Sequence, residues 1–207
     1  SEGYSFKHYD DFFTNQDWQH ALKNSLRIAP MATVLSVSFG TLAAIGLSQS
    51  HVPFRRAIMA VMISPMIVPL IISASGMYFF YSRIGLQGTY AGVVLAHAVL
   101  GVPFVIITVL AGLKNYDFNQ ELAARSLGAS RPRALLTITL PQVKFSIQTG
   151  ALLAFMTSLD DVVIAMFVSG GENATITRRM FNTLRDQVDP TIAAISTCLI
   201  FVSVSAL

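Results

Sequence analysis

Charged side chains are scarce in this 207-residue sequence. They make up 12% of the residues, whereas about 25% is typical of a soluble domain. Hydrophobic residues make up 53%, and the mean hydropathy is +0.59. This composition excludes an ordinary soluble domain and predicts a protein that lies in a lipid membrane. The formal net charge of +3 then reflects basic loops, and we expect no nucleic-acid partner.

Cysteine and nucleotide-binding motifs are also lacking. Cys198 is the only cysteine, which excludes an internal disulfide framework and a cysteine-based zinc cluster. The four histidines are scattered along the chain, so we expect no metal site. No Walker A pattern, glycine-rich phosphate loop or catalytic triad occurs. We therefore expect the chain to bind no cofactor, to hydrolyse no ATP and not to be an enzyme.

Long apolar runs dominate instead, and five of them reach about the 20 residues that a helix needs to cross a bilayer. They cover residues 28–47, 57–82, 90–113, 145–171 and 190–207. None shows the alternation of a membrane-barrel strand. We predict an all-α class, a polytopic transmembrane helix bundle that forms a single domain over residues 1–207. Because the chain starts without Met and ends within an apolar run, we expect a fragment that shows five of six spans.

Small residues and prolines lie inside these runs. Gly40 in the first run and Gly150 in the fourth predict close approach of helix backbones, which small residues permit in lipid. Pro65 and Pro69 lie in the second run. We expect kinks there, because proline lacks the N–H that a continuous helix uses.

Basic residues indicate the orientation. The loops 48–56 and 114–144 lie on one side of a five-span bundle, and they concentrate seven lysines and arginines in fewer positions than the alternate loops use. Cytoplasmic loops carry the excess of basic residues. We therefore predict that residues 114–144 are cytoplasmic and that residues 170–190 lie outside.

The cytoplasmic loop contains an amphipathic segment with the sequence ELAARSLG at residues 121–128. Its small and apolar residues recur at helical spacing: Leu122, Ala123, Ser126 and Leu127. Arg125 falls on another face, and Gly128 stands where a helix can end. We predict a short surface helix. Its apolar face can rest on lipid headgroups, on the cytoplasmic ends of the bundle or in a groove of a partner protein, and the pattern leaves these three open.

Residues 121–141 resemble the cytoplasmic signature loop of the permease subunits of binding-protein-dependent ABC importers. In that loop Glu-Ala-Ala is followed by Gly and then by Ile-x-Leu-Pro, and the matching residues here are Ala123, Ala124, Gly128, Ile138, Leu140 and Pro141. The resemblance extends over almost the whole chain, with HALKNS before the first run, LAHAVLGVPFVI in the third and SLDDVVIAMFVSG in the fourth. It is greatest to the second permease of the spermidine/putrescine type. It departs from the pattern at Leu122, which stands where the family has Glu, whereas Glu121 lies one position earlier and about 100° away around a helix.

The resemblance implies a transport mechanism and its partners. Two permease subunits, expected to be different chains, would form the pathway in the bacterial inner membrane. ATP-binding subunits that hold ATP and magnesium would dock on the cytoplasmic side, and an extracytoplasmic solute-binding protein would deliver a polyamine or a similar small cation. The implied ATPase-coupling residues are Glu121, Leu122, Ala123, Ala124, Arg125, Ser126, Leu127 and Gly128, and the loop signature is completed by Ile138, Leu140 and Pro141.

Asp160 and Asp161 interrupt the fourth run. An acid inside a membrane span is costly and by default faces a cavity or a partner group. Adjacent residues diverge by about 100° around a helix, so the two carboxylates cannot share one face. Our hypothesis places them on the substrate pathway, where a carboxylate helps a cation to leave water. The alternative is a bond to a neighbouring helix, for instance a salt bridge to Arg178 or Arg179. For His97 we expect a neutral ring that is hydrogen-bonded to another helix.

Other functions fit the sequence less well. The cargo of an ABC importer can also be an opine, an aminoalkylphosphonate or a metal ion. A secondary transporter driven by an ion gradient is a competitor, because acids and prolines inside spans suit broken-helix sites. An intramembrane aspartyl protease needs acids on two helices. Tyr116-Asp117 imitates half of that signature, but it lies in a loop, and no Gly-x-Gly-Asp occurs.

Overall fold

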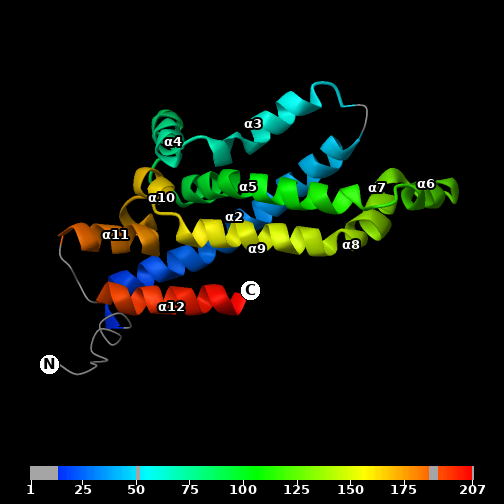
Figure 1. Cartoon of the computed structure of the whole chain (residues 1–207). Coiled ribbons are helices and arrows are strands. Elements are labelled where there is room, and N and C mark those ends of the chain that lie inside the picture. Colours follow the sequence, from blue (N-terminus) through cyan, green and yellow to red (C-terminus); the bar gives the residue numbers. More distant parts are fainter. Residues whose placement is uncertain (1–13, 50–51, 187–190, 207) are drawn as a thin grey trace.

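The computed structural model describes residues 14–49, 52–186 and 191–206. Within these ranges the chain is helical and contains no strand, which confirms the predicted all-α class. Three helices lie side by side, α2 (Gln16–Ser48), α5 (Tyr90–Lys114) and α9 (Lys144–Asp160) (Figure 1). The loop that follows α5 forms one end of the molecule, and the segment that follows α9 forms the opposite end (Figure 1).

Small residues set the spacing of these three helices. Gly40 of α2 and Gly150 of α9 both contact Val105 of α5, which is fully buried. A Cβ atom at Gly40 would lie 2.7 Å from Val105 Cβ, and one at Gly150 would lie 2.9 Å from Val105 Cα. Real Cβ atoms do not approach so closely, so the helices would have to move apart to hold any larger residue. The predicted close approach is confirmed at both glycines.

The second apolar run is broken into two helices. α3 (Arg55–Ile67) and α4 (Leu70–Ile84) meet at an angle of 102°. Pro69 disfavours the helical conformation at the residue before it, and Val68 is accordingly extended, with ψ 133°. The expected kink at Pro69 is confirmed, but it is so sharp that residues 57–82 do not form one continuous helix. After the bend, α4 packs against α10 (Val163–Val168).

The fourth run is also broken, because α9 ends at Asp160 and Asp161 is extended, with ψ 122°. Beyond α10 follow η2 (Gly171–Asn173), α11 (Ile176–Asp186) and α12 (Thr191–Ala206). Both α11 and α12 pack on the first turns of α2, where Trp18, Ile176 and Ile195 share one buried cluster.

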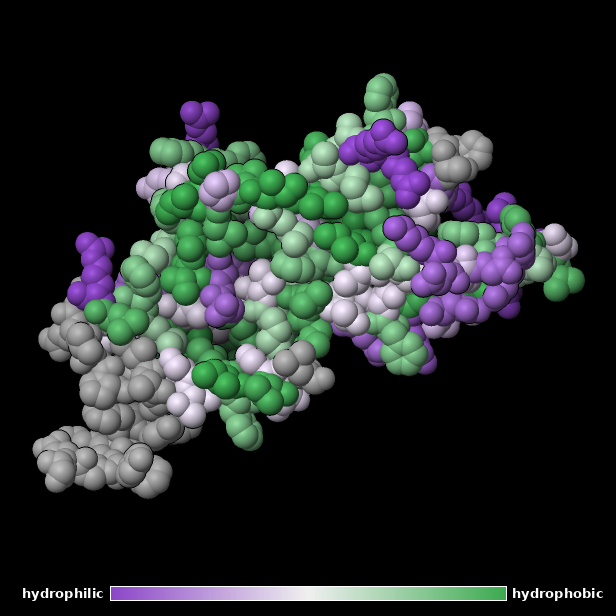
Figure 2. Space-filling model, viewed as in Figure 1, coloured by the Kyte–Doolittle hydropathy of each residue, from purple (hydrophilic) through white to green (hydrophobic). Residues whose placement is uncertain are grey.

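The number of spans follows from these breaks. By length and composition α2 and α5 can each cross a membrane, and the bent pair of α3 and α4 makes a third span if it is counted as one. With 17 residues, α9 lies at the lower limit of the roughly 17–25 residues of a spanning helix. Figure 2 shows hydrophobic residues over the middle of this face and hydrophilic residues gathered at the end that carries the loop after α5. The polytopic bundle is confirmed, while two of the five predicted runs, 57–82 and 145–171, are interrupted.

Candidate functional site

The loop between α5 and α9 folds into short helical segments, and the first of them is the predicted surface helix. The segments are α6 (Asn119–Ser126), α7 (Arg131–Ala134), the π-helical η1 (Leu135–Thr139) and α8 (Leu140–Gln142). Asp117 stabilises the start of α6, because its Oδ1 accepts the backbone N–H of Asn119 at 3.0 Å. Gly128 ends the turn, with a φ of 94° in the left-handed region and its N–H on the Arg125 carbonyl. The predicted helix and its stop at Gly128 are confirmed.

The apolar face of α6 is not buried against the helix bundle, although Leu122 borders a cavity between α6 and the ends of α2 and α5. The side chain of Leu127 is 90% exposed and that of Leu122 is 55% exposed, and Ala123 and Ser126 are exposed as well. Of the three resting places that the pattern left open, the bundle's own ends do not cover this face in the structure. Lipid and a partner protein remain.

Thr139 ties α6 to the membrane helices, and sequence reasoning missed it. This side chain is 1% exposed, and its hydroxyl lies 3.1 Å from the Tyr116 hydroxyl and 3.1 Å from Glu121 Oε2. A carboxylate only accepts, so Thr139 donates to Glu121 and offers a lone pair to Tyr116. Tyr116 is itself buried just after α5. A short polar chain thus runs from the end of a spanning helix to the first turn of α6.

The signature residues surround this anchor. Ile138 and Leu140 flank Thr139 and are half-buried, whereas Pro141 is exposed. A second tie joins α8 to α6, because Gln142 Nε2 donates to Gln120 Oε1 at 2.5 Å. The displaced Glu121 therefore bonds inside the loop, while Leu122, which stands where the signature has Glu, borders a cavity between the loop and the ends of α2 and α5. The one feature of the sequence that could have indicated the bond between Glu121 and Thr139 was the shift of the acid by a single residue from its position in the signature.

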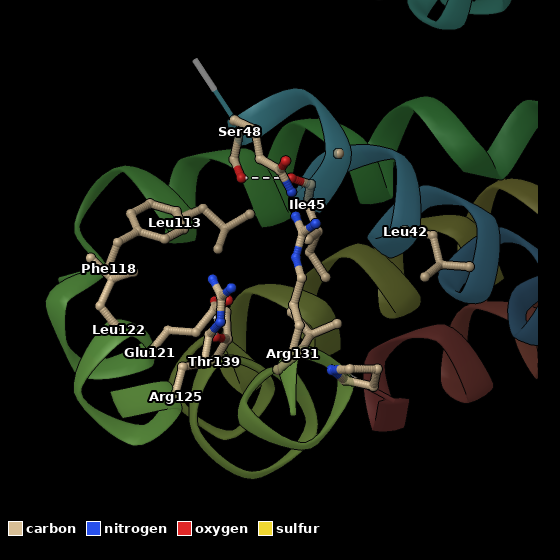
Figure 3. Close-up of a pocket in the computed structure, with 14 residues that line it drawn as sticks. Leu42, Ile45, Ser48, Leu113, Phe118, Glu121, Leu122, Arg125, Arg131 and Thr139 are labelled. Carbon is tan, nitrogen blue, oxygen red and sulfur yellow. Dashed lines mark hydrogen bonds between the residues drawn. The ribbon is translucent and has the colours of Figure 1, made fainter. Parts of the chain in front are cut away.

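A cavity of about 900 Å³ lies between this loop and the ends of α2 and α5 (Figure 3). Its membrane side includes the apolar side chains of Leu42, Ile45 and Leu113 and, at the end of α2, the polar Ser48. From the loop, the side chains of Arg125 and Arg131 reach into it (Figure 3).

The two adjacent acids lie at the break between α9 and α10 in different surroundings. Asp161 is 6% exposed, and its carboxylate accepts the backbone N–H groups of Ala165 at 2.8 Å and Ile164 at 3.3 Å. Its backbone carbonyl accepts the Thr177 hydroxyl at 2.6 Å. Asp160 is exposed and borders two cavities of about 430 and 480 Å³. Asp161 also borders the cavity of about 480 Å³, because it lies beyond the end of α9 and its position does not follow helical rotation. Of the two acids, Asp161 is the one held by backbone donors.

His97 packs against the same break from α5. It is 1% exposed, and its Nδ1 lies 2.7 Å from the Ser158 hydroxyl of α9, which confirms the expected bond to another helix. The second ring nitrogen, Nε2, lies 3.5 Å from Asp161 Oδ2. Among the residues that the structure describes, no three His, Cys, Asp or Glu side chains gather as a metal site would require.

The alternative salt bridges from the two acids to the arginines of α11 are wrong. Arg179 pairs instead with Asp17 at 2.8 Å, at the start of α2. Arg178 donates to the backbone carbonyl of Ser169. Within the described ranges, neither guanidinium forms an ion pair with the acids at the helix break, because each has a closer partner.

Known proteins resemble the chain over most of its length. The family model "Binding-protein-dependent transport system inner membrane component" matches residues 36–207. The spermidine/putrescine transport system permease protein PotC of Haemophilus influenzae is 30% identical over 204 residues, which are 99% of this chain and 79% of the relative. The putrescine transport system permease protein PotI of Escherichia coli is 29% identical over 96% of this chain and 73% of its own length.

Solved structures agree on the fold. A bacterial ABC transporter that imports the acidic polysaccharide alginate contains a chain that superposes with a TM-score of 0.75 at 18% identity, over 100% of this chain and 80% of that one. An amino acid ABC transporter gives a TM-score of 0.69 at 16% identity, over 99% of this chain and 95% of that one.

These matches and the apolar helices describe a multi-pass protein of the bacterial inner membrane that is a transport subunit and not an enzyme. The chain belongs to the family of inner membrane components of binding-protein-dependent transport systems.

Proposed function

We propose that this chain is a permease subunit of an ATP-driven importer and that ATP-binding subunits dock on α6. The observation that carries this proposal is the exposed apolar face of a helix that is itself firmly attached. Leu127 is 90% exposed, yet α6 is held by Glu121 on the buried Thr139. An exposed apolar patch on an anchored element is typical of a protein interface.

The anchor supplies the coupling that such a transporter needs. A partner that moves α6 also moves Thr139 and Tyr116, and Tyr116 packs in the same buried cluster as Val105 and Val109 of α5. Rigid-body movement of a docked subunit is thereby passed to a spanning helix. In this proposal residues 114–144 are cytoplasmic, and ATP and magnesium are bound by the partner subunits, not by this chain.

The remaining partners complete the pathway. A second permease subunit of different sequence faces this one, and an extracytoplasmic solute-binding protein delivers the cargo. The family is defined by its dependence on a binding protein, which supports the proposed solute-binding partner.

The cargo that we propose is a polyamine or a similar small cation. Relatives named for spermidine and putrescine support this choice. So does the exposed carboxylate of Asp160, which borders a cavity between the α3–α4 bend and α5, because a carboxylate favours a cation that is leaving water. Asp161 has its carboxylate occupied by the α10 backbone, so we assign the pathway role to Asp160.

The deciding experiment is uptake of labelled putrescine and spermidine into vesicles that contain the complete transporter, with and without ATP inside. We expect uptake only with ATP. ATP-stimulated turnover without polyamine uptake would move the cargo to another class, such as an opine, an aminoalkylphosphonate or a metal ion. Accumulation that is indifferent to ATP would instead indicate a carrier driven by an ion gradient.

Docking on α6 is tested separately by Leu127→Ser, which removes apolar surface without touching the core. We expect the affinity of the permease for the ATPase subunits to fall roughly tenfold, as for a central interface residue. Fewer ATPase subunits should then remain in the purified complex. Leu184→Ser is the matched control, since Leu184 is 49% exposed on α11 at the opposite end of the molecule. Equal retention of ATPase subunits by both variants would contradict the proposed docking surface.

A further inference from the structure

The cavity beside α6 has the chemistry of a membrane surface. Its wall on α2 is apolar at Leu42 and Ile45 and becomes polar at Ser48, and Leu42 is 63% exposed within the predicted first span. Its wall on the loop carries two guanidinium groups, those of Arg125 and Arg131 (Figure 3). Since Leu113 and Ser48 lie in the last turns of α5 and α2, the cavity lies where the spans leave the hydrocarbon.

Some polar groups around this cavity have hydrogen-bond partners within the chain, whereas its two arginines have no ion-pair partner among the described residues. Glu121 accepts the Thr139 hydroxyl, and the Ser48 hydroxyl donates to the Ile45 carbonyl at 2.7 Å (Figure 3). In the described part of the chain, neither Arg125 nor Arg131 has an ion-pair partner. Two guanidiniums against one carboxylate leave the cavity positive.

We propose that this cavity binds the phosphate headgroup of an anionic membrane lipid, with Arg125 and Arg131 as its phosphate ligands. Arginine binds phosphate oxygens through paired N–H donors, and basic pockets at the cytoplasmic ends of membrane helices suit anionic headgroups. Leu42 and Ile45 then contact the first part of the acyl chains. A volume of about 900 Å³ holds a headgroup, because ligand pockets of drug-sized molecules measure roughly 300–1,000 Å³. This site goes beyond the proposed transport function and needs neither cargo nor ATP.

The test is lipid retention by the permease assembly, purified without ATPase subunits from nanodiscs of equal parts phosphatidylglycerol and phosphatidylcholine, and measured by native mass spectrometry. Wild-type protein is expected to retain phosphatidylglycerol selectively. The double variant Arg125→Gln with Arg131→Gln should lose roughly fivefold in retention per arginine. The control is Arg133→Gln with Lys144→Gln, which makes the same change of charge on exposed residues that do not line the cavity.

Three results would overturn the proposal. Equal retention by the double variant and the control would show that the arginines do not hold the lipid. Displacement of phosphatidylglycerol by inorganic phosphate would assign the site to free phosphate. Release of the lipid when purified ATPase subunits are added would assign the cavity to the protein partner. Because no ATPase or substrate is present in the first measurement, its failure is distinct from a failure of the proposed transport.

Discussion

Two adjacent acids illustrate how residues with the same chemistry take different roles. The carboxylate of Asp161 accepts hydrogen bonds from two backbone N–H groups of α10, and its backbone carbonyl accepts one from the Thr177 hydroxyl. Asp161 therefore holds the helix break together. Among the described residues Asp160 makes no such contact, and it borders two cavities, one of which Asp161 also lines. Asp161 lies beyond the last residue of α9 and is extended, so the helical rotation of about 100° between neighbours does not account for this difference.

Substitutions should separate the two roles. Asp161→Ala removes the carboxylate oxygens that accept the backbone N–H groups of Ile164 and Ala165. We expect a loss of about 1–2 kcal/mol in the free energy of unfolding, measured by thermal melting in detergent. Asp161→Asn keeps one acceptor oxygen and should recover most of it. Asp160→Asn should melt like wild type, while ATP-driven uptake of putrescine falls roughly tenfold, or about 1.4 kcal/mol. Normal uptake by Asp160→Asn would remove Asp160 from the pathway.

Thr139 offers a second test at this scale. Thr139→Val keeps the shape but removes the hydroxyl that donates to Glu121, so α6 loses its tie to Tyr116. We expect ATPase subunits to remain bound while ATP-driven uptake falls severalfold, because docking is intact and transmission is not. Thr137→Val is the matched control, since that exposed hydroxyl donates to the Arg133 carbonyl one turn earlier and, within the described residues, makes no bond to α6. A variant that transports like the control would show that the tie is not needed.

At the scale of elements, the residues at helix ends decide where each apolar run is divided into separate helices. Proline breaks the second run, since it disfavours helix at Val68. An acid breaks the fourth run, since Asp161 bonds the N–H groups that α10 leaves free. A glycine ends α6 with a left-handed φ, where N–H groups of Leu127, Gly128 and Ala129 return to helix carbonyls.

Gly128 should therefore be sensitive to any side chain. Gly128→Ala forces a Cβ into the left-handed region, which costs roughly 1–2 kcal/mol. We expect faster hydrogen exchange at the amides of residues 127–129, and a smaller effect for Gly128→Asn, because asparagine tolerates this conformation. Gly76→Ala, in α4 with open space around it, serves as control and should leave the exchange unchanged. Unaltered exchange in Gly128→Ala would mean that this turn does not hold the end of α6.

The whole molecule presents two chemically different ends. The loop after α5 carries the exposed apolar face of α6 and the arginine-lined cavity, whereas the other end carries the Arg179–Asp17 pair and the helix break. These two parts lie at opposite ends of the three long helices (Figure 1), which predicts that they face opposite sides of a bilayer.

Cysteine labelling can test that orientation, because Cys198 is the only native cysteine. In a Cys198→Ala background, Leu127→Cys should react with a membrane-impermeant maleimide only from the cytoplasmic side. Glu172→Cys, also at an exposed position, should react only from outside. Labelling of both positions from one side would contradict the predicted topology.

The sequence by itself determined the class, the apolar runs and the position of α6. Those features follow from composition, from the length of a membrane span and from a glycine after a helical pattern, all of which are local properties of the chain. The close approach of α2 and α9 to α5 at Gly40 and Gly150 was likewise readable as small residues, although their common contact, Val105, was not.

The tertiary structure alone decided which groups meet. The contacts that matter most join residues from separate elements. They are the hydrogen bond of Thr139 to Glu121, the pairing of Arg179 with Asp17, the contact of His97 with Ser158, and the cavity that Arg125 and Arg131 line. Periodicity places a side chain on a face of its own helix, but its partners depend on how helices cross and where they bend. Those angles are set by packing in three dimensions, where a single proline turns two helices by 102°.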